Sequence, residues 1–471
     1  MPTECSATQL EFQGLGSRKV QACFDGGHVS SDGGALLLRE ADVRLDVTKR
    51  FAACFTDYRD AELIEHSVLE LVRQRVYGLA LGYEDLNDHD GLMRDPLLAL
   101  ALGKDDPEGH NRHRVSDRGK ALASSSTLNR LELTPANAGS ASRYKKIAYH
   151  PEQIEALFVE VFLDSFEHAP EEIILDFDAT DDPLHGNQEG RFFHGYYGCY
   201  CYLPLYVTCG EHLLVAKLRE ANQDASAGSV DVLAYLVQRI RARWPAVHII
   251  LRGDSGFTRE PIMAWCEAND IDYVLGLAKN SRLLGSIGRE MENAHVGYIQ
   301  TATASRVFTQ FCYRTQKTWS TARRVIAKAE HLAKGPNPRF IVTSLSDTYA
   351  CEQKLYENVY CARGDMENRI KEQQLDLFAD RTSSHTMRAN QLRLWFSSLA
   401  YVLLSALRRL ALKNTRLAKA TCGSIRLKLL KIGAQVKVSV RRFMIHLASA
   451  CPHQDVFIQA WNNLQQYPLR T

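Results

Sequence analysis

Residues 173–178, IILDFD, decide the fold class, because a short apolar run that ends in carboxylates is typical of a buried strand. Four more strands are predicted downstream, at 200–207 (YCYLPLYV), 212–218 (HLLVAKL), 247–252 (VHIILR) and 273–277 (YVLGL). Apolar residues at helical spacing predict helices at 230–241 and 260–268. Strands in a row, followed by strand–helix–strand, predict an α/β fold in which helices flank a mixed sheet.

The sequence on either side of this region has other patterns. Residues 1–167 predict a mainly helical domain after a short turn-rich segment, and Pro151 begins its last helix. Residues 282–345 contain predicted strands at 307–313, 323–328 and 339–343, which we interpret as a β-rich insertion. Helices are predicted at 360–378 and 387–412, and an exposed strand at 436–440. The predicted segments are therefore 1–167, 168–281, 282–345, 346–412 and 413–471.

The composition predicts a globular protein of the cytoplasm. Of 471 residues, 45% are hydrophobic and 24% are charged, so disorder is not expected. The first thirty residues lack the basic and apolar regions of a secretory signal. Residues 395–407 (WFSSLAYVLLSAL) are apolar but too few to span a bilayer. The twelve cysteines are scattered and form no two C-x-x-C pairs, so we predict that they stay reduced.

Positive charge is concentrated near the C-terminal end of the chain. Residues 381–450 contain 14 Lys or Arg and no Asp or Glu, whereas the rest of the chain has 43 basic and 55 acidic residues. This asymmetry is expected of a protein that binds a polyanion such as nucleic acid. The alternatives are a solvated basic surface and an intramolecular partner for the acidic remainder. The candidate DNA-binding residues of this segment are Arg426, Lys428, Lys431, Arg441 and Arg442.

Two carboxylates lie at the ends of predicted buried strands. Asp178 ends the strand at 173–178, and Asp254 follows the strand at 247–252. Open α/β sheets place their sites at the carboxyl ends of neighbouring strands, so the two side chains are expected to converge, and a divalent metal ion usually neutralises such a cluster. The alternative is that each Asp only caps the turn after its strand. Asp176 faces the same side of its strand as Asp178 and is a rival metal ligand.

A third carboxylate lies in the predicted helix at 360–378. Tyr360, Arg363, Glu367 and Lys371 follow one another at spacings of three and four residues, so on a helix they share one face. A carboxylate for metal beside Tyr, Arg and Lys for phosphate makes chemical sense as one site. The alternative is a solvent-exposed helix with i,i+4 salt bridges.

These motifs together resemble those of bacterial insertion-sequence transposases of the DDE class, in the branch with a Y-x2-R-x3-E signature. Tyr360, Arg363 and Glu367 fit that signature, Asp178-x-Thr180 resembles the first acidic motif, and RGDSGF at 252–257 resembles the second. The stretches that resemble one subfamily are 24–27 (FDGG), 85–90 (DLNDHD), 273–280 (YVLGLAKN) and 425–433 (IRLKLLKIG). The resemblance covers nearly the whole chain.

The resemblance implies an RNase H-like catalytic core that the β-rich insertion interrupts before Glu367. It implies a DNA transposase whose catalytic residues Asp178, Asp254 and Glu367 hold two Mg²⁺ (or Mn²⁺) ions, roughly 3.5–4 Å apart. Arg363 and Lys371 would bind phosphates near the scissile bond, and Tyr360 would hydrogen-bond one.

The resemblance also implies the partners of the chain. They are double-stranded DNA, as the element's terminal inverted repeats and as target DNA, and a second copy of the chain in the DNA complex. Residues 1–167 would bind the DNA ends, and residues 413–471 would serve DNA binding and dimerisation.

Several questions stay open in the sequence. Many relatives have Lys seven residues after the signature Glu, where this chain has Gln374, and Lys371 is the candidate substitute. Trp319 either stacks on an unpaired DNA base or is a core residue of the β-rich segment. An RNase H-like nuclease without strand transfer, or a transposase-derived DNA-binding protein without catalysis, would share most of these features. The presence of all three carboxylates weighs against the inactive alternative.

Overall fold

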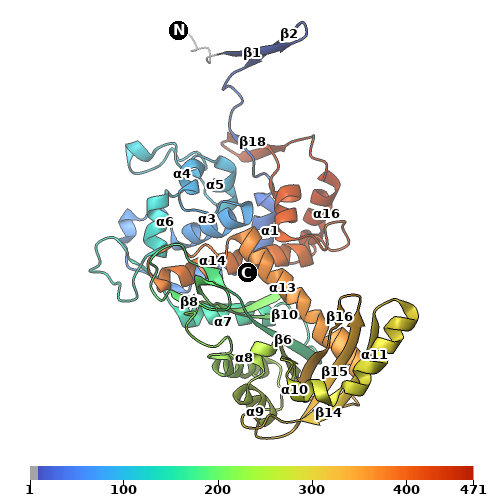
Figure 1. Cartoon of the computed structure of the whole chain (residues 1–471). Helices are drawn as coiled ribbons and strands as arrows, with labels where there is room; N and C mark the ends of the chain where they lie inside the picture. Colours follow the sequence, from blue (N-terminus) through green and yellow to red (C-terminus); the bar gives the residue numbers. More distant parts are fainter. Residues whose placement is uncertain (1–8, 470–471) are drawn as a thin grey trace, which may run out of the picture. The chain divides into compact units, whose positions relative to one another are not determined.

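The computed structural model describes residues 9–469. Within them the chain forms two compact units: residues 9–149 with 399–469 form unit 1, and residues 150–398 form unit 2. Figure 1 colours the chain along its sequence, so unit 1 contains both the blue N-terminal part and the red C-terminal part. Helix α14 (Met387–Leu410) carries the chain from unit 2 back to unit 1.

Unit 1 is mainly helical. Helix α3 (Val68–Leu81) begins at a capping box of Ser67 and Glu70, and it ends at Gly82, whose φ of 95° favours glycine. The other helices are α1 (Ala35–Leu45), α2 (Val47–Ala52), α4 (Asp88–Leu92), α5 (Pro96–Leu102), α6 (Ser125–Glu132), α15 (Cys422–Ile425) and α16 (Gln454–Gln465). Two short antiparallel pairs are β1 (Leu10–Leu15) with β2 (Arg18–Ala22), and β4 (Phe55–Asp57) with β5 (Ile147–Tyr149).

The C-terminal segment completes unit 1. The hairpin of β18 (Ala434–Ser439) and β19 (Arg442–Leu447) extends the short strand β3 (Val29–Ser30) into a three-stranded sheet. The N–H of Gly34 donates to the carbonyl of Leu430 at 3.0 Å, and α1 packs against α16. A side chain at position 34 would overlap the Leu429 carbonyl, so glycine permits this close approach. Two segments that are distant in sequence therefore form one compact unit.

Unit 2 is built around a nine-stranded mixed sheet. Its strands lie in the order β11-β10-β6-β12-β13-β17-β15-β14, and β16 pairs with β15. The pairs β6–β12 and β12–β13 are parallel, and the other pairs are antiparallel. The strands are β6 (Glu172–Ala179), β10 (Leu205–Cys209), β11 (His212–Lys217), β12 (His248–Gly253), β13 (Asp272–Leu277), β14 (Ser305–Tyr313), β15 (Arg323–Leu332), β16 (Gly335–Pro336) and β17 (Arg339–Thr343).

Apolar side chains cover both faces of this sheet. Strand β6 sends Ile173, Leu175 and Phe177 to one face, where they join a large core with residues of the helices. These helices are α7 (Pro151–Leu163), α8 (Ser229–Arg243), α9 (Glu260–Ala268) and α10 (Ser281–Ser286), while α11 (Gly288–Thr301) packs on β14 and β15. On the other face, Ile250 and Val274 pack with Leu355 and Tyr356. By strand alternation, Asp176 and Asp178 point to this second face.

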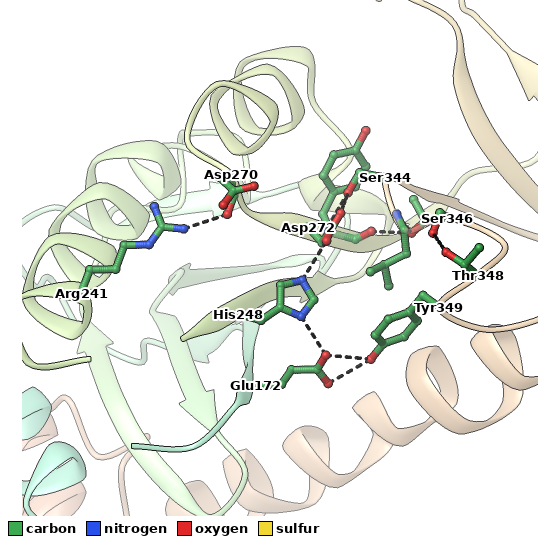
Figure 2. A network of polar contacts seen from close by, with 12 residues as sticks. Glu172, Arg241, His248, Asp270, Asp272, Ser344, Ser346, Thr348 and Tyr349 are labelled. Atoms are coloured by element: carbon green, nitrogen blue, oxygen red, sulfur yellow. Dashed lines mark hydrogen bonds and ion pairs between the residues drawn. The ribbon is translucent and has the colours of Figure 1, made fainter. Parts of the chain in front are cut away.

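The amino ends of the parallel strands are joined by a polar network (Figure 2). His248, at the start of β12, bonds through Nδ1 to Glu172 Oε2 at 2.9 Å and through Nε2 to Asp272 Oδ2 at 2.8 Å. The Tyr349 hydroxyl donates to both oxygens of Glu172, at 2.9 and 3.1 Å, and the Ser344 hydroxyl donates to Asp272 Oδ1 at 2.7 Å. The network links the starts of three adjacent strands, at the end of the sheet opposite to Asp178.

The structure refines several predicted elements. The predicted strand at 200–207 is two strands, β9 (Cys199–Tyr202) and β10, because Pro204 lies between them and cannot donate to a ladder. Strand β9 belongs to a small separate sheet with β7 (Asp182–Pro183) and β8 (Phe192–His194). The predicted strands of residues 282–345 are confirmed, but β17, β15 and β14 continue the central sheet, and helices α10 and α11 precede them.

The compact units do not follow the predicted segment boundaries. Helix α7 packs against β11 and belongs to unit 2, so the unit begins at residue 150 rather than at 168. Residues 399–469 belong to unit 1 together with the N-terminal part. Among residues 9–469, no helix combines the length and the apolar character needed to cross a bilayer.

Candidate active site

Two of the predicted carboxylates lie at the carboxyl ends of adjacent parallel strands. Asp178 is near the end of β6, and Asp254 directly follows β12. Asp254 also caps a short 3-10 helix, since its Oδ1 accepts from the Gly256 N–H at 2.8 Å. Asp254 therefore does cap its turn, but the capping hydrogen bond uses only one of its two carboxylate oxygens.

A helical segment on the same face of the sheet supplies the third carboxylate. It runs from α12 (Glu352–Lys354) through a π-helical stretch, Leu355–Tyr360, and a 3-10 turn to α13 (Gly364–Lys371), and a second π-helical stretch, Glu372–Asp376, follows. Single π-helical turns are common at functional sites, because they shift the side chains that follow around the helix axis. Tyr360 ends the first of these stretches, and Glu367 lies in α13.

Arg363 lies between the first carboxylate, Asp178, and the third, Glu367. Its Nη1 lies 3.4 Å from Asp178 Oδ2 and 3.0 Å from Glu367 Oε1. The side chains of Arg363 and Asp178 are only 12% and 13% exposed, whereas that of Glu367 is 51% exposed. The guanidinium therefore lies between a buried and an accessible carboxylate.

The proximity of these charges shifts their pKa values. Burial raises the pKa of Asp178 to about 6, Arg363 opposes the rise, and the neighbouring charges of Asp254 and Glu367 add to it. Burial lowers the pKa of Arg363, but the charges of Asp178, Asp254 and Glu367 outweigh burial and raise it. One guanidinium thus faces three carboxylates, and the cluster retains an excess of negative charge.

Asp176, the rival of Asp178, has another partner. The guanidinium of Arg252 binds both of its oxygens, at 2.5 and 2.7 Å, and this pair is buried. Arg252 Nη1 also donates to the carbonyl of Val359, which precedes Tyr360. Asp176 is therefore neutralised inside the sheet, and its ion pair with Arg252 anchors the helical segment that carries Arg363.

Tyr360 fits closely against strand β13. A Cβ at Gly276 would lie 2.5 Å from the Tyr360 hydroxyl and 3.0 Å from the Ser255 N–H, so glycine leaves the space that the phenol occupies. Burial raises the pKa of Tyr360, and the charge of Asp254 adds to the rise. Five of the predicted site residues are thus brought together: Asp178, Asp254, Tyr360, Arg363 and Glu367.

Three other predicted residues have different surroundings. Lys371 is exposed at the end of α13. Gln374 donates through Nε2 to the carbonyl of Asp181 at 3.1 Å, so it links the helical segment to the first motif. Trp319 is 7% exposed in the large core, its ring lies edge-on to Tyr313, and the Arg323 guanidinium lies over it. The core alternative for Trp319 therefore fits its position better than base stacking does.

The basic C-terminal residues divide into two groups. Arg426 donates to the carbonyls of Leu79 and Ala80 at the end of α3, at 3.2 and 2.9 Å. Lys431 forms a 2.7 Å ion pair with the buried Asp32. By contrast, Lys428, Arg441 and Arg442 are exposed. The first two residues have structural partners in unit 1, and the last three are accessible to DNA.

Two residues near the carboxylates were not singled out from the sequence. Arg252 lies in register with Asp176 on the neighbouring strand, and a charged residue inside the otherwise apolar run at 247–252 is the sequence signal for it. Tyr197 is half-buried, and burial followed by the charges of Asp181 and Asp178 raises its pKa to about 12. No sequence pattern indicated Tyr197, because its position depends on the fold of the small sheet.

Asp178, Asp254 and Glu367 offer the oxygen ligands that a divalent metal ion needs. Hard oxygen ligands are those that Mg²⁺ prefers, and a cation would oppose the burial and the neighbouring negative charges that raise the pKa of Asp178. The described residues form no ready group of three metal-ligating side chains in the present arrangement, in which Arg363 bonds to two of the carboxylates. Metal binding would therefore require Arg363 to release them.

No curated protein matches this sequence. Among solved structures, a cryo-EM structure of a piggyBac transposase synaptic complex with hairpin DNA is similar at a TM-score of 0.41, with 11% identity, over 84% of this chain and 79% of that chain. A family model described as transposase DDE domain group 1 matches residues 12–469. Because this match spans nearly the whole sequence, the chain belongs to the transposase DDE domain group 1 family.

Proposed function

We propose that this DNA transposase cleaves the ends of its insertion sequence and joins the resulting 3′-hydroxyl ends to target DNA by two-metal-ion phosphoryl transfer. The observation that carries the proposal is the convergence of Asp178, Asp254 and Glu367 around Arg363. The carboxylates come from three separate sequence motifs, and the charges of all three act on Arg363.

The strand order supports an RNase H-like core. Strands β11, β10 and β6 form an antiparallel group, and β12 and β13 continue from β6 in parallel. The first carboxylate follows β6 and the second follows the neighbouring β12, as expected for sites at the carboxyl ends of α/β sheets. Strands β17, β15 and β14 then extend the edge of the sheet before the chain reaches Glu367.

Asp178, Asp254 and Glu367 would hold two Mg²⁺ or Mn²⁺ ions. Bound in this way, the ions supply activation of the attacking hydroxyl and stabilisation of the leaving oxygen. Arg363, freed from its carboxylate partners, would bind the scissile phosphate, with Lys371 at the exposed end of the same helix. The hydroxyl of Tyr360 would donate to the same phosphate group.

Charge and exposure support DNA contacts in unit 1. Lys428, Arg441 and Arg442 are exposed in a segment without acidic residues, and such side chains bind phosphates along a duplex. We propose that unit 1 binds the terminal repeats. Two DNA ends must meet before they are joined, so we expect a homodimer in the DNA complex.

The deciding experiment is incubation with DNA that carries the element's own ends, with and without Mg²⁺. Asp178→Ala, Asp254→Ala and Glu367→Ala should each abolish cleavage and leave end binding largely intact, because these side chains bind metal rather than DNA. Asp365→Ala is the matched control, since it removes an exposed carboxylate of the same helix, two residues from Glu367.

The products distinguish the proposed function from its alternatives. Cleavage followed by joined products is expected of a transposase. Cleavage without joined products would indicate a nuclease, and Mg²⁺-independent binding without cleavage would indicate an inactive DNA-binding derivative. Strong cleavage by any one of the three carboxylate variants would remove that residue from the proposed site.

A further inference from the structure

A hairpin rich in exposed aromatic residues lies beside the candidate active site. Strands β8 and β9 form it, and β9 pairs with β7 through Asp182 and Tyr202. Four of its aromatic side chains are exposed to unusual extents: Phe192 at 39%, Phe193 at 58%, Tyr196 at 87% and Tyr200 at 46%. Exposed apolar side chains gathered on one short element are a mark of a binding surface.

Contacts within the hairpin hold several of these rings in place. Phe193 and Tyr200 meet edge to face, with centroids 5.6 Å apart and planes at 74°. The guanidinium of Arg191 lies 4.6 Å from the centre of the Tyr200 ring. Tyr196 is edge-on to Tyr197 at 5.0 Å, and Tyr197 contacts His194. The hairpin thus carries ring pairs that contact one another edge to face, with one cation beside them.

Tyr197 of the hairpin packs close to the segments that carry the proposed catalytic carboxylates. Tyr197 packs on a small apolar cluster with Ala179, the residue after Asp178, and with Ala225. A Cβ at Gly256, two residues after Asp254, would contact the same Ala225 at 3.5 Å. The Gln374 bond to the Asp181 carbonyl ties the Glu367 helix to the strand that leads into the hairpin. Through Tyr197, the hairpin thus adjoins the segments of Asp178 and Asp254, and the Glu367 segment contacts the chain just before β7.

We propose that this hairpin binds unpaired bases of the DNA strand at the cleavage site, by stacking them on Phe193, Tyr196 and Tyr200. This inference rests on the proposed function, since it places the ligand in the DNA that the carboxylates would cut. Aromatic faces stack on any base, and Arg191 adds a cation for the backbone between bases. A duplex with bases already unpaired at its end should bind best, because no base pair has to be broken.

This assignment gives a base-stacking role to residues that the sequence did not indicate. Trp319, the candidate from the sequence, packs in the core, whereas Tyr196 is 87% exposed. The hairpin occupies the chain between the strand of Asp178 and the strand β10 that pairs with it. Its rings can therefore contact DNA that reaches the carboxylates.

The test compares three DNA probes with wild-type protein and with variants of the hairpin. The probes are a fully paired duplex of the element's end, the same duplex with its last bases mismatched, and an oligo-dT single strand. The variants Phe193→Ala and Tyr196→Ala should bind the mismatched duplex and oligo-dT roughly 5- to 100-fold more weakly, and the paired duplex nearly as well as wild type. Tyr196→Trp should restore binding, since it restores an aromatic face.

Tyr349→Ala serves as the control, because it removes a 39% exposed tyrosine at the opposite end of the parallel strands. Unchanged binding by the hairpin variants would overturn the inference and leave the proposed function standing. An equal loss on all three probes, or a change in dimer formation with unchanged DNA binding, would likewise overturn it. Wild-type protein that bound none of the probes would refute both the inference and the proposed function.

Discussion

Replacing Asp178 by asparagine should stabilise the metal-free protein while it removes a metal ligand. The amide oxygen can keep the hydrogen bond from the Ala179 N–H, which is 3.0 Å long. The carboxylate that it replaces is 13% exposed and lies near the charges of Asp254 and Glu367. Asp178→Asn therefore removes unfavourable electrostatic energy with little change in packing.

The magnitude follows from the pKa of Asp178, which rises from 3.8 to about 6 on folding. The folded state binds this proton more tightly than the unfolded state, so ionisation lowers stability progressively between about pH 4 and pH 6 and fully above that range. At about 1.4 kcal/mol per pKa unit, the carboxylate costs at most about 3 kcal/mol at neutral pH. Asp178→Asn should recover about 1–3 kcal/mol there, and progressively less as the pH falls towards 4.

Urea unfolding in the presence of a chelator, at neutral and at mildly acidic pH, measures this gain. Addition of Mg²⁺ should then stabilise the wild type more than Asp178→Asn, because binding to the folded state alone raises its stability. Asp176→Asn is the matched control on the same strand. Burial raises the pKa of Asp176 too, but Asn there breaks its two-bond ion pair with the buried Arg252. Arg363, by contrast, still has Asp254 and Glu367 near it when Asp178 is replaced, so it is Asp176→Asn that should lose stability, by roughly 3–5 kcal/mol. An Asp178→Asn protein that was less stable than wild type, or equally stabilised by Mg²⁺, would refute the reasoning.

Two further predictions concern the basic tail and the polar network of Figure 2. Neutralising Lys428, Arg441 and Arg442 together should weaken DNA binding and reduce the slope of log affinity against log salt concentration by up to roughly three units. Neutralising Arg426, the control, should mainly lower the stability of the protein. An unchanged slope would exclude phosphate contacts by the three residues. Burial lowers the pKa of His248, but hydrogen bonds to Asp272 and Glu172 raise it further, so the net shift is upward. The stabilisation by the charged imidazole is therefore fully present below about pH 6.5, and it is lost as the pH rises through the higher pKa of the folded state. Because the side chain is 35% exposed, we expect a loss below about 1 kcal/mol over that range, and His248→Gln should abolish this pH dependence in urea unfolding.

The central strands could be predicted because burial on both faces gives them continuous apolar sequences. The runs at 173–178 and 247–252 are the parallel pair β6 and β12. The single strand predicted at 200–207 is two strands, since local apolar character does not show that Pro204 divides two sheets. Nor does local sequence show that strands of residues 305–343 join the central sheet, because strand pairing is a non-local property.

The carboxylates could be found from their motifs, but their electrostatic surroundings could not. The choice between Asp176 and Asp178 depends on Arg252, which is 76 positions from Asp176 in the chain and adjacent to it in the sheet. The placement of Trp319 in the core depends on the packing of Tyr313 and Arg323 around it. Charge counts in the tail likewise could not reveal that Arg426 caps α3, because the helix it caps lies more than 300 residues earlier.

The division of unit 1 between the two ends of the chain has a consequence for synthesis in the cell. Strand β3 and Gly34 acquire their partners only when residues 430–436 have emerged from the ribosome, after all of unit 2. At roughly 5–20 residues per second, the N-terminal part waits on the order of ten seconds to a minute for them. Unit 2 is contiguous and can fold in that interval, so the carboxylate site would be assembled before unit 1. A product truncated before residue 399 would leave the N-terminal helices without their packing partners and exposed to proteases.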